Sequence, residues 1–150
     1  MDPQGYDAGK KVTGRKRHIL VDTLGLLLSV VVHPANVQDR DGVREVLQQA
    51  RRSFPFIERI FADAGYQGPR AAEAAAQTGA WVLEIVKRIQ DHQFVVVPKR
   101  WIVERTFAWV SHYRRLARDF ERYARTVAAF FRLAMIRLML RRITQPTPSS

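Results

Sequence analysis

The stretch P-K-R-W-I-V-E-R-T-F-A-W-V-S-H-Y-R-R-L-A-R, residues 98–118, organises the chain. Its apolar residues Val103, Phe107 and Val110 recur at helical spacing. A proline at the start suits the first turn of a helix, where an N–H group has no intrahelical partner. We therefore predict one helix over residues 98–118. Glu104 is the only acidic residue within it.

Glu104 has two possible roles in such a helix. Arg100 lies four residues before it and Arg115 eleven after it, so the three would share one helical face. A fixed carboxylate among cations suits a metal ligand beside a bound polyanion. It also suits an ordinary surface ion pair, which is common at this spacing and weak. The residues alone leave both interpretations open.

The charge of the chain points to a polyanionic partner. Its 150 residues, enough for one domain, contain 25 Lys and Arg against 14 Asp and Glu, a net charge of +11. Residues 98–142 hold twelve basic and three acidic side chains. Arginines interleaved with aromatic residues suit phosphates and bases, so nucleic acid is favoured over a membrane. The alternative is a basic face that only aids solubility.

Several classes of protein are excluded by composition. The chain has no cysteine, which rules out disulfides and thiolate zinc sites. Its polar start has no apolar core of a secretory signal. The longest apolar run, Leu24–Val32, is far shorter than the ~20 residues a membrane-spanning helix needs. We therefore expect a cytoplasmic protein without membrane contact.

Periodicity and turn residues predict the element order β-β-α-β-α-β-α-α, which is an α/β pattern with a mixed sheet. Asp39 or Asp41 is the expected cap of the first helix. We expect residues 1–17 to form a basic arm without a strand, 18–143 to form the domain, and 144–150 to be a disordered tail. The expected elements are strands at 18–22, 26–32, 57–62 and 81–86, an extended segment at 94–97, and helices at 42–54, 70–77, 98–118 and 123–143.

Asp63 is the second carboxylate of interest. It follows the predicted strand 57–62, at the sheet end where α/β proteins usually place their chemistry. Carboxylates on rigid elements suit Mg²⁺ or Mn²⁺, and two such ions about 4 Å apart promote phosphoryl transfer. That chemistry normally uses three carboxylates, and an aspartate before Gly65 also suits a simple turn. Both interpretations of Asp63 therefore stay open.

Over residues 5–143 the sequence resembles bacterial insertion-sequence transposases of the DDE type, in the insertion-sequence-five family. The motifs that carry the resemblance are G-Y-D-A-G-K-K (5–11), G-R-K-R-H-I-L-V-D (14–22), A-N-V-Q-D-R-D-G (35–42), A-D-A-G-Y (62–66), R-W-I-V-E-R-T-F-A-W (100–109) and L-A-M-I-R-L-M-L-R-R (133–142).

This resemblance implies an RNase H-like fold and two-metal cleavage and joining of DNA ends. Asp63 matches the second catalytic acid of the family. Glu104 matches the third, in an R-x3-E arrangement with Arg100. Both acids would be catalytic and would hold Mg²⁺ or Mn²⁺, and the partner would be double-stranded DNA, both transposon ends and target. The expected DNA contacts are Lys10, Lys11, Arg15, Lys16, Arg17, Lys99, Arg100, Arg105, Arg114 and Arg115.

The sequence departs from the family pattern at three places. Val97 stands where the family has a tyrosine, and Ser111 where it has a lysine, whose role Arg114 or Arg115 would take. No apolar strand with the first catalytic aspartate precedes His18. We therefore expect an RNase H-like sheet lacking its first, central strand, from a truncated frame or the downstream frame of a frameshifted element.

An uncovered sheet of this kind predicts a chain that is marginally stable, homo-oligomeric or bound to the upstream-frame polypeptide. The alternative to a catalytic fragment is a non-catalytic DNA-binding or regulatory transposase remnant.

Overall fold

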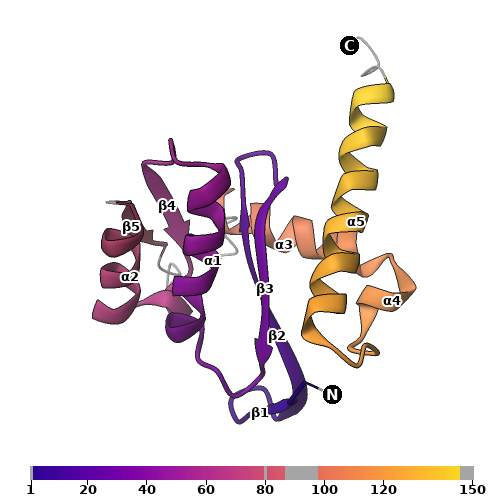
Figure 1. Ribbon diagram of the computed structural model, residues 1–150, viewed down its shortest axis with the longest axis horizontal. Coiled ribbons are helices and arrows are strands. Elements are labelled where there is room, and N and C mark those ends of the chain that lie inside the picture. Colours follow the sequence, from indigo (N-terminus) through magenta and orange to yellow (C-terminus); the bar gives the residue numbers. More distant parts are fainter. Residues whose placement is uncertain (1, 80, 87–97, 146–150) are drawn as a thin grey trace, which may run out of the picture.

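The computed structural model of the chain describes residues 2–79, 81–86 and 98–145 (Figure 1). The predicted extended segment 94–97 lies outside the described residues. The elements are β1 Gly5–Asp7, β2 Val12–Val21, β3 Leu27–Pro34, α1 Asp39–Ser53, β4 Arg59–Ala62, the short 3-10 helix η1 Ala64–Tyr66, α2 Pro69–Gly79, β5 Val82–Ile85, α3 Pro98–Ser111, α4 Arg114–Ala117 and α5 Ala124–Thr144.

A long hairpin of β2 and β3 lies at the centre of the molecule. The two strands pair antiparallel from Arg15 opposite Pro34 to Val21 opposite Leu27. Asp22 shapes the turn between them, because its Oδ1 accepts from the backbone N–H groups of Leu24 at 2.9 Å and of Leu26 at 2.7 Å. The prediction of two neighbouring strands is confirmed, and β2 begins earlier than expected.

The N-terminal residues do contain strands, so the prediction of a strandless arm was wrong. β1 pairs antiparallel with the first residues of β2, with Gly5 opposite Gly14. The turn is closed by Asp7, whose Oδ1 accepts from the N–H groups of Gly9 at 3.0 Å and Lys10 at 3.1 Å. This polar segment has no apolar alternation that would predict a strand. It is held by the Asp7 side chain, which accepts hydrogen bonds from the backbone of the turn.

The helix α1 begins at Asp39, so the prediction that Asp39 or Asp41 caps it was also wrong. Gln38 occupies the cap position and makes no side-chain cap hydrogen bond. Both aspartates lie inside the first turn, where their negative charge interacts favourably with the positive end of the helix dipole. Their carboxylates face cations instead, Asp39 with Lys16 at 3.4 Å and Asp41 with Arg70 at 3.0 Å.

The predicted helix 98–118 is divided in two, because α3 ends at Ser111 and α4 begins at Arg114. Ser111 Oγ and His112 Nδ1 each lie 2.8 Å from the Ala108 carbonyl oxygen. Tyr113 then adopts an extended conformation, with φ −85° and ψ 116°. Arg115 therefore belongs to a different helix from Glu104, and the prediction that Arg115 shares a helical face with Glu104 was wrong.

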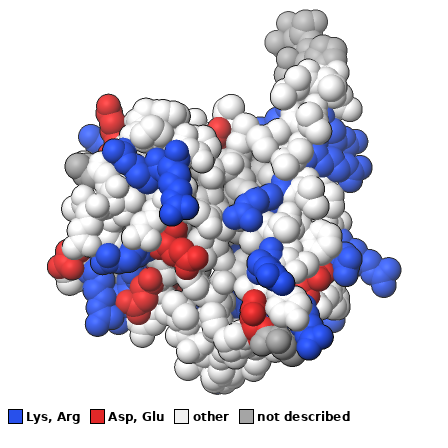
Figure 2. All heavy atoms as spheres, viewed as in Figure 1, with Lys and Arg blue, Asp and Glu red and all other residues white. Residues whose placement is uncertain are grey.

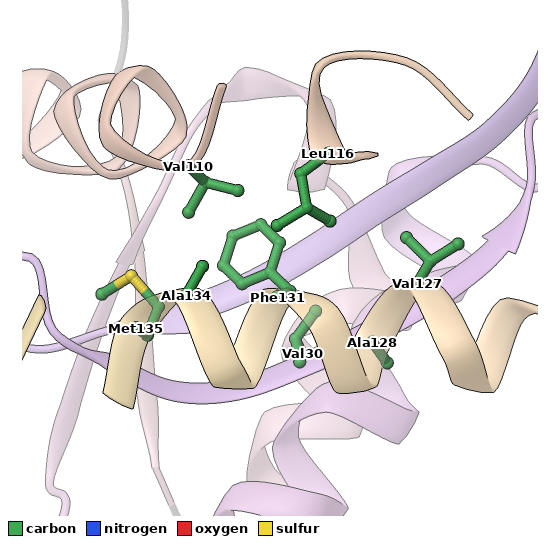
Figure 3. Close-up of a cluster of buried hydrophobic side chains, with 8 residues drawn as sticks. All are labelled: Val30, Val110, Leu116, Val127, Ala128, Phe131, Ala134 and Met135. Atoms are coloured by element: carbon green, nitrogen blue, oxygen red, sulfur yellow. The ribbon is translucent and has the colours of Figure 1, made fainter. Parts of the chain in front are cut away.

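Two groups of buried side chains hold the molecule together. The first, here the C-terminal core, joins β3, α3, α4 and α5 around the fully buried ring of Phe131, which Figure 3 shows directed from α5 toward Val110 and Leu116. Its buried members are Val30, Val110, Leu116, Val127, Ala128, Phe131, Ala134 and Met135.

The second group, here the alanine core, joins α1, α2 and β4. The helix α2 contributes only alanines to it, which lets the backbones of α1 and α2 approach closely. Its buried members are Val43, Leu47, Ala50, Ile60, Ala71, Ala74, Ala75 and Trp81.

The described strands form two sheets, an antiparallel β1-β2-β3 sheet and a parallel β4-β5 sheet. In Figure 1, α1 covers one side of the β2–β3 hairpin and α5 the other. The α/β class is confirmed, and the arrangement is that of an RNase H-like fold lacking its central strand. None of the described helices is both long and apolar enough to cross a membrane.

Candidate DNA-processing site

A cavity of about 610 Å³ separates the two sheets, and it is called the central groove below. Strand β2 lines it over residues 12–20, and β4 lines it over residues 60–62. The helices α1 and α3 contribute side chains such as Val43 and Val103. The central groove therefore lies where the central strand of the fold would run.

Asp63 lies at the rim of the central groove, directly after β4. Its Oδ1 accepts from the Gly65 N–H at 2.9 Å and so begins the short helix η1. The side chain is exposed. The turn-forming role of Asp63 is thus present, and it uses one oxygen of a carboxylate that faces the central groove.

Glu104 lies on α3 and lines the same groove. Its side chain is exposed. The fold therefore brings the two acids selected from the sequence to one cavity, although forty-one positions separate them. Arg100 belongs to α3 by its backbone, and its side chain lies outside the part of the chain that the structure describes.

A third carboxylate, Asp39, also lines the central groove, and the sequence analysis considered it only as a helix cap. A methyl group built on Gly65 would lie 2.8 Å from Asp39 Oδ2 and 3.0 Å from Asp63 Oδ1, so both carboxylates approach the same glycine. Lys16 Nζ lies 3.4 Å from Asp39 and 3.3 Å from Asp7. The motif A-N-V-Q-D-R-D-G, which contains Asp39, was the signal that could have found it.

Tyr66 and His18 support the turn that carries Asp63. The Tyr66 hydroxyl lies 3.0 Å from Nδ1 of the buried His18, which ties η1 to β2. Burial lowers the pKa of His18 to about 4, with the neighbouring His33 adding to the effect, so the ring is neutral at pH 7. Burial, together with Asp39 and Asp63, raises the pKa of Tyr66, so its hydroxyl keeps its proton and donates to the imidazole.

The basic residues of β2 are used inside the fold. The side chain of Arg15 is buried and donates to the Glu121 carbonyl oxygen at 3.0 Å. Arg17 donates to the Leu116 carbonyl oxygen at 2.6 Å, and burial lowers its pKa. These two arginines join β2 to α4 and to the segment that follows it.

The other predicted DNA contacts have more accessible positions. Lys10, Lys11, Lys99 and Arg114 are exposed. Arg115 is exposed as well and pairs with Glu121 at 3.0 Å. Figure 2 shows that Lys and Arg side chains lie in separate groups on the displayed face, with acidic side chains between them. The basic charge therefore does not form one continuous patch on that face.

Arg105 lies between two tryptophans on α3. Its guanidinium carbon is 4.4 Å from the ring centre of Trp101 and 4.9 Å from that of Trp109. It also donates to the Leu24 carbonyl oxygen at 2.9 Å, which fixes the turn between β2 and β3 against α3. Trp101 remains 47% exposed beside it.

The donor chemistry around the central groove fits a hard divalent cation. Asp39, Asp63 and Glu104 offer carboxylate oxygens, the ligands that Mg²⁺ and Mn²⁺ prefer. No three potential metal ligands form a cluster within the described ranges. The groove thus has suitable donors from three elements but not a compact set of three in this arrangement.

Comparison with known proteins identifies the family. The family described as "Transposase DDE domain" matches residues 1–139, and the chain belongs to it. Its matching relatives include a protein described as a transposase for insertion sequence element IS402, from Burkholderia cepacia. The two are 34% identical over 128 residues, which cover 80% of this chain and 60% of the relative. No solved structure matches the chain.

The chain thus spans only part of the length of this relative. Membership in the insertion-sequence DDE transposases is established by the family match. The narrower assignment to the insertion-sequence-five family stays a prediction.

Proposed function

We propose that this chain is the part of a DDE transposase that cleaves DNA and joins its ends, with Asp63 and Glu104 as catalytic metal ligands. The observation that carries the proposal is that both acids line the central groove of a DDE transposase domain. They reach it from different elements, the end of β4 and the middle of α3. Such convergence of distant acids is typical of a site and not of chance surface charge.

Bound Mg²⁺ or Mn²⁺ would supply Lewis-acid activation of the DNA phosphate and of the attacking hydroxyl. Asp63 would hold the metal through the carboxylate oxygen that does not accept from Gly65, and Glu104 would hold it from α3. His18 and Tyr66 keep the Asp63 turn in place. Asp39 also lines the groove, but it forms no three-ligand cluster with Asp63 and Glu104 among the described residues.

Phosphate contacts fall to the exposed cations near the groove. Lys10 and Lys99 line the groove, and Lys11 lies next to Lys10 in the turn before β2. Arg100, Arg105, Arg114 and Arg115 extend the proposed path along α3 and α4. Arg15, Lys16 and Arg17 stabilise the fold through the contacts described above, and they add positive potential behind the path.

The test is strand transfer by this chain fused to the expected upstream-frame polypeptide, with Mg²⁺ and end-containing DNA. Asp63→Asn and Glu104→Gln should each lower the rate by at least about 100-fold, because each removes a charged ligand while keeping the shape. Glu73→Gln, on the exposed side of α2, is the matched control and should act as the parent does. Parent-like rates from either groove variant would reject the assignment.

A second candidate function, a non-catalytic DNA-binding or regulatory protein, is favoured by the lack of a three-ligand cluster among the described residues. It predicts a DNA mobility shift that weakens steeply with salt, without metal-dependent cleavage. In that case Asp63→Asn would leave DNA affinity unchanged or slightly stronger, since it removes a negative charge. Cleavage that depends on Asp63 would exclude this candidate.

A further inference from the structure

The helix α5 has two apolar faces, one of which packs inside the molecule. Phe131 and its neighbours on that side of the helix belong to the C-terminal core. The opposite side carries large apolar side chains that are between 47% and 79% exposed, namely Leu133, Ile136, Leu140 and Ile143. Apolar side chains scattered singly over a surface are ordinary, but a row of them on one helix face indicates a docking surface.

These exposed side chains follow the spacing of a coiled-coil seam. Successive members are three, four and three residues apart, and an exposed alanine continues the series four residues earlier. At 3.6 residues per turn, this spacing keeps the side chains in one narrow stripe along the helix. The stripe is called the α5 seam below, and it consists of Ala129, Leu133, Ile136, Leu140 and Ile143.

The C-terminal half of the α5 seam has space around it. In Figure 1 the last turns of α5 project beyond the strands and the other helices. Every residue from 140 to 145 is exposed. A second helix can therefore approach Leu140 and Ile143 without displacing any other described part of the chain.

The flanks of the α5 seam are positively charged. Helical geometry places four exposed arginines along its borders, Arg125 and Arg132 on one side, Arg137 and Arg141 on the other. The sequence from residue 122 to 150 contains six arginines and no acidic residue. A second copy of α5 would place arginine against arginine, whereas a helix with carboxylates on its flanks would complement them.

We propose that the α5 seam is a docking site for an acidic amphipathic helix of another polypeptide. The partner helix would have an apolar seam of the same spacing, with Glu or Asp on both flanks. Its apolar side chains would pack between those of α5, and its carboxylates would face the arginines. The surface includes neither Asp63 nor Glu104, so this inference is independent of the proposed catalytic function.

An anionic membrane is the other kind of partner that a basic helix with an apolar face suits. Helices that lie in a membrane interface present a broad apolar face that contains Trp or Phe. The α5 seam is narrow, and all of its side chains are aliphatic. A protein helix is therefore the better fit.

The probe is a capped, fluorescently labelled peptide of three E-I-A-A-L-E-K repeats, with Ile and Leu on its seam and Glu on its flanks. Repulsion between the glutamates opposes pairing of the peptide with itself. Anisotropy titration with the purified chain, without DNA or metal, should show saturable one-to-one binding with a Kd below about 100 µM. A peptide of three K-I-A-A-L-K-E repeats has the same apolar seam and should bind at least about tenfold more weakly. Absent binding, or equal binding of the two peptides, would overturn the proposal.

Leucine variants separate the α5 seam from the general positive charge of the chain. Leu140→Ser removes an apolar contact and should weaken binding of the acidic peptide by about tenfold. Leu24→Ser is the matched control, because Leu24 is 60% exposed in the turn between β2 and β3 and Leu140 is 56% exposed. The control should leave binding within about twofold. If both variants bind alike, the peptide does not occupy the α5 seam and the proposal is wrong.

Arginine variants test the flanks. The double variant Arg137→Gln with Arg141→Gln should weaken binding by about threefold or more and reduce its dependence on salt. Arg40→Gln with Arg44→Gln removes the same charge at the same spacing from exposed positions of α1. At about 0.1 M salt the Debye length is ~10 Å, so this control should bind nearly as the parent does. Equal losses from the two double variants would contradict the proposed flank contacts.

Two further measurements exclude the other occupants. Light scattering should show a monomer, and a dimer that Leu140→Ser abolishes would identify a second copy as the occupant. Vesicles of phosphatidylcholine and phosphatidylserine should not compete with the acidic peptide. Vesicle binding that displaces the peptide and is lost in Leu140→Ser would identify a membrane as the occupant. Either of these results would overturn the proposal.

Discussion

The C-terminal core and the alanine core solve the same packing problem in opposite ways. Phe131 fills the centre of the first with a large ring, enclosed by side chains from three other elements. In the second, Ala71, Ala74 and Ala75 let α2 lie directly on α1. One core therefore depends on a large side chain, and the other on the lack of one. Since the central groove lies between them, each wall of the groove is held by its own core.

Among the predictions for the two cores, the largest loss of stability should follow from shortening a buried side chain of the C-terminal core. Phe131→Ala removes a ring that is fully buried, and we expect a loss of about 3–5 kcal/mol in the free energy of unfolding from burial and cavity terms. Urea denaturation followed by circular dichroism measures it.

Leu133→Ala on the same helix is the control, because Leu133 is 59% exposed and should cost within about 0.5 kcal/mol. A similar loss from both variants would show that α5 does not pack as described.

Acid should weaken the contact between β2 and α1, at the boundary of the alanine core. His18 is buried there with a pKa of about 4, against 6.5 in the unfolded chain. The unfolded chain therefore binds more protons between these values. The contribution of neutral His18 to the free energy of unfolding is fully present above pH 6.5. It decreases as the pH falls toward 4 and below, by about 3 kcal/mol in total. Denaturant midpoints across this window measure it.

The groups that face His18 are Tyr66, His33, Asp39, Lys16 and Glu45. His18→Gln keeps a polar side chain without the titration, so its stability should vary less between pH 6.5 and 4 than that of the parent. An unchanged slope in the variant would assign the acid sensitivity to other groups.

The sequence predicted those parts of both cores that follow from regular spacing. The buried strands and the long helix α5 were expected because their apolar residues recur without interruption. The break after Ser111 was missed because Val110 and Leu116 both belong to the C-terminal core, so the apolar pattern continues across it. Spacing alone cannot show that the chain turns between two core residues.

Contacts between residues far apart in the sequence could not be predicted from the spacing of apolar residues. Asp2 Oδ2 accepts from the Ala124 N–H at 2.7 Å and so caps α5 from the other end of the chain. Asp39 approaches Asp63 only after α1 folds onto η1. Asp63 and Glu104 could be selected because the family motifs name them. Their common groove became visible only with the placement of β4 and α3.

A larger side chain in the alanine core should lower the free energy of unfolding. The loss should be smaller than the loss from Phe131→Ala in the C-terminal core. Ala75 is fully buried where α2 meets α1, so Ala75→Leu forces three carbons into a space without room for them. We expect a loss of about 1–3 kcal/mol, the usual cost of overpacking. Ala76→Leu, one position further on the exposed side of α2, makes the same chemical change and should stay within about 0.5 kcal/mol. Because the two variants differ only in the face of α2 they occupy, the difference between their urea midpoints isolates the close approach of α1 and α2. Equal midpoints would mean that this core has spare volume, and the contrast with the C-terminal core would then be one of composition and not of packing.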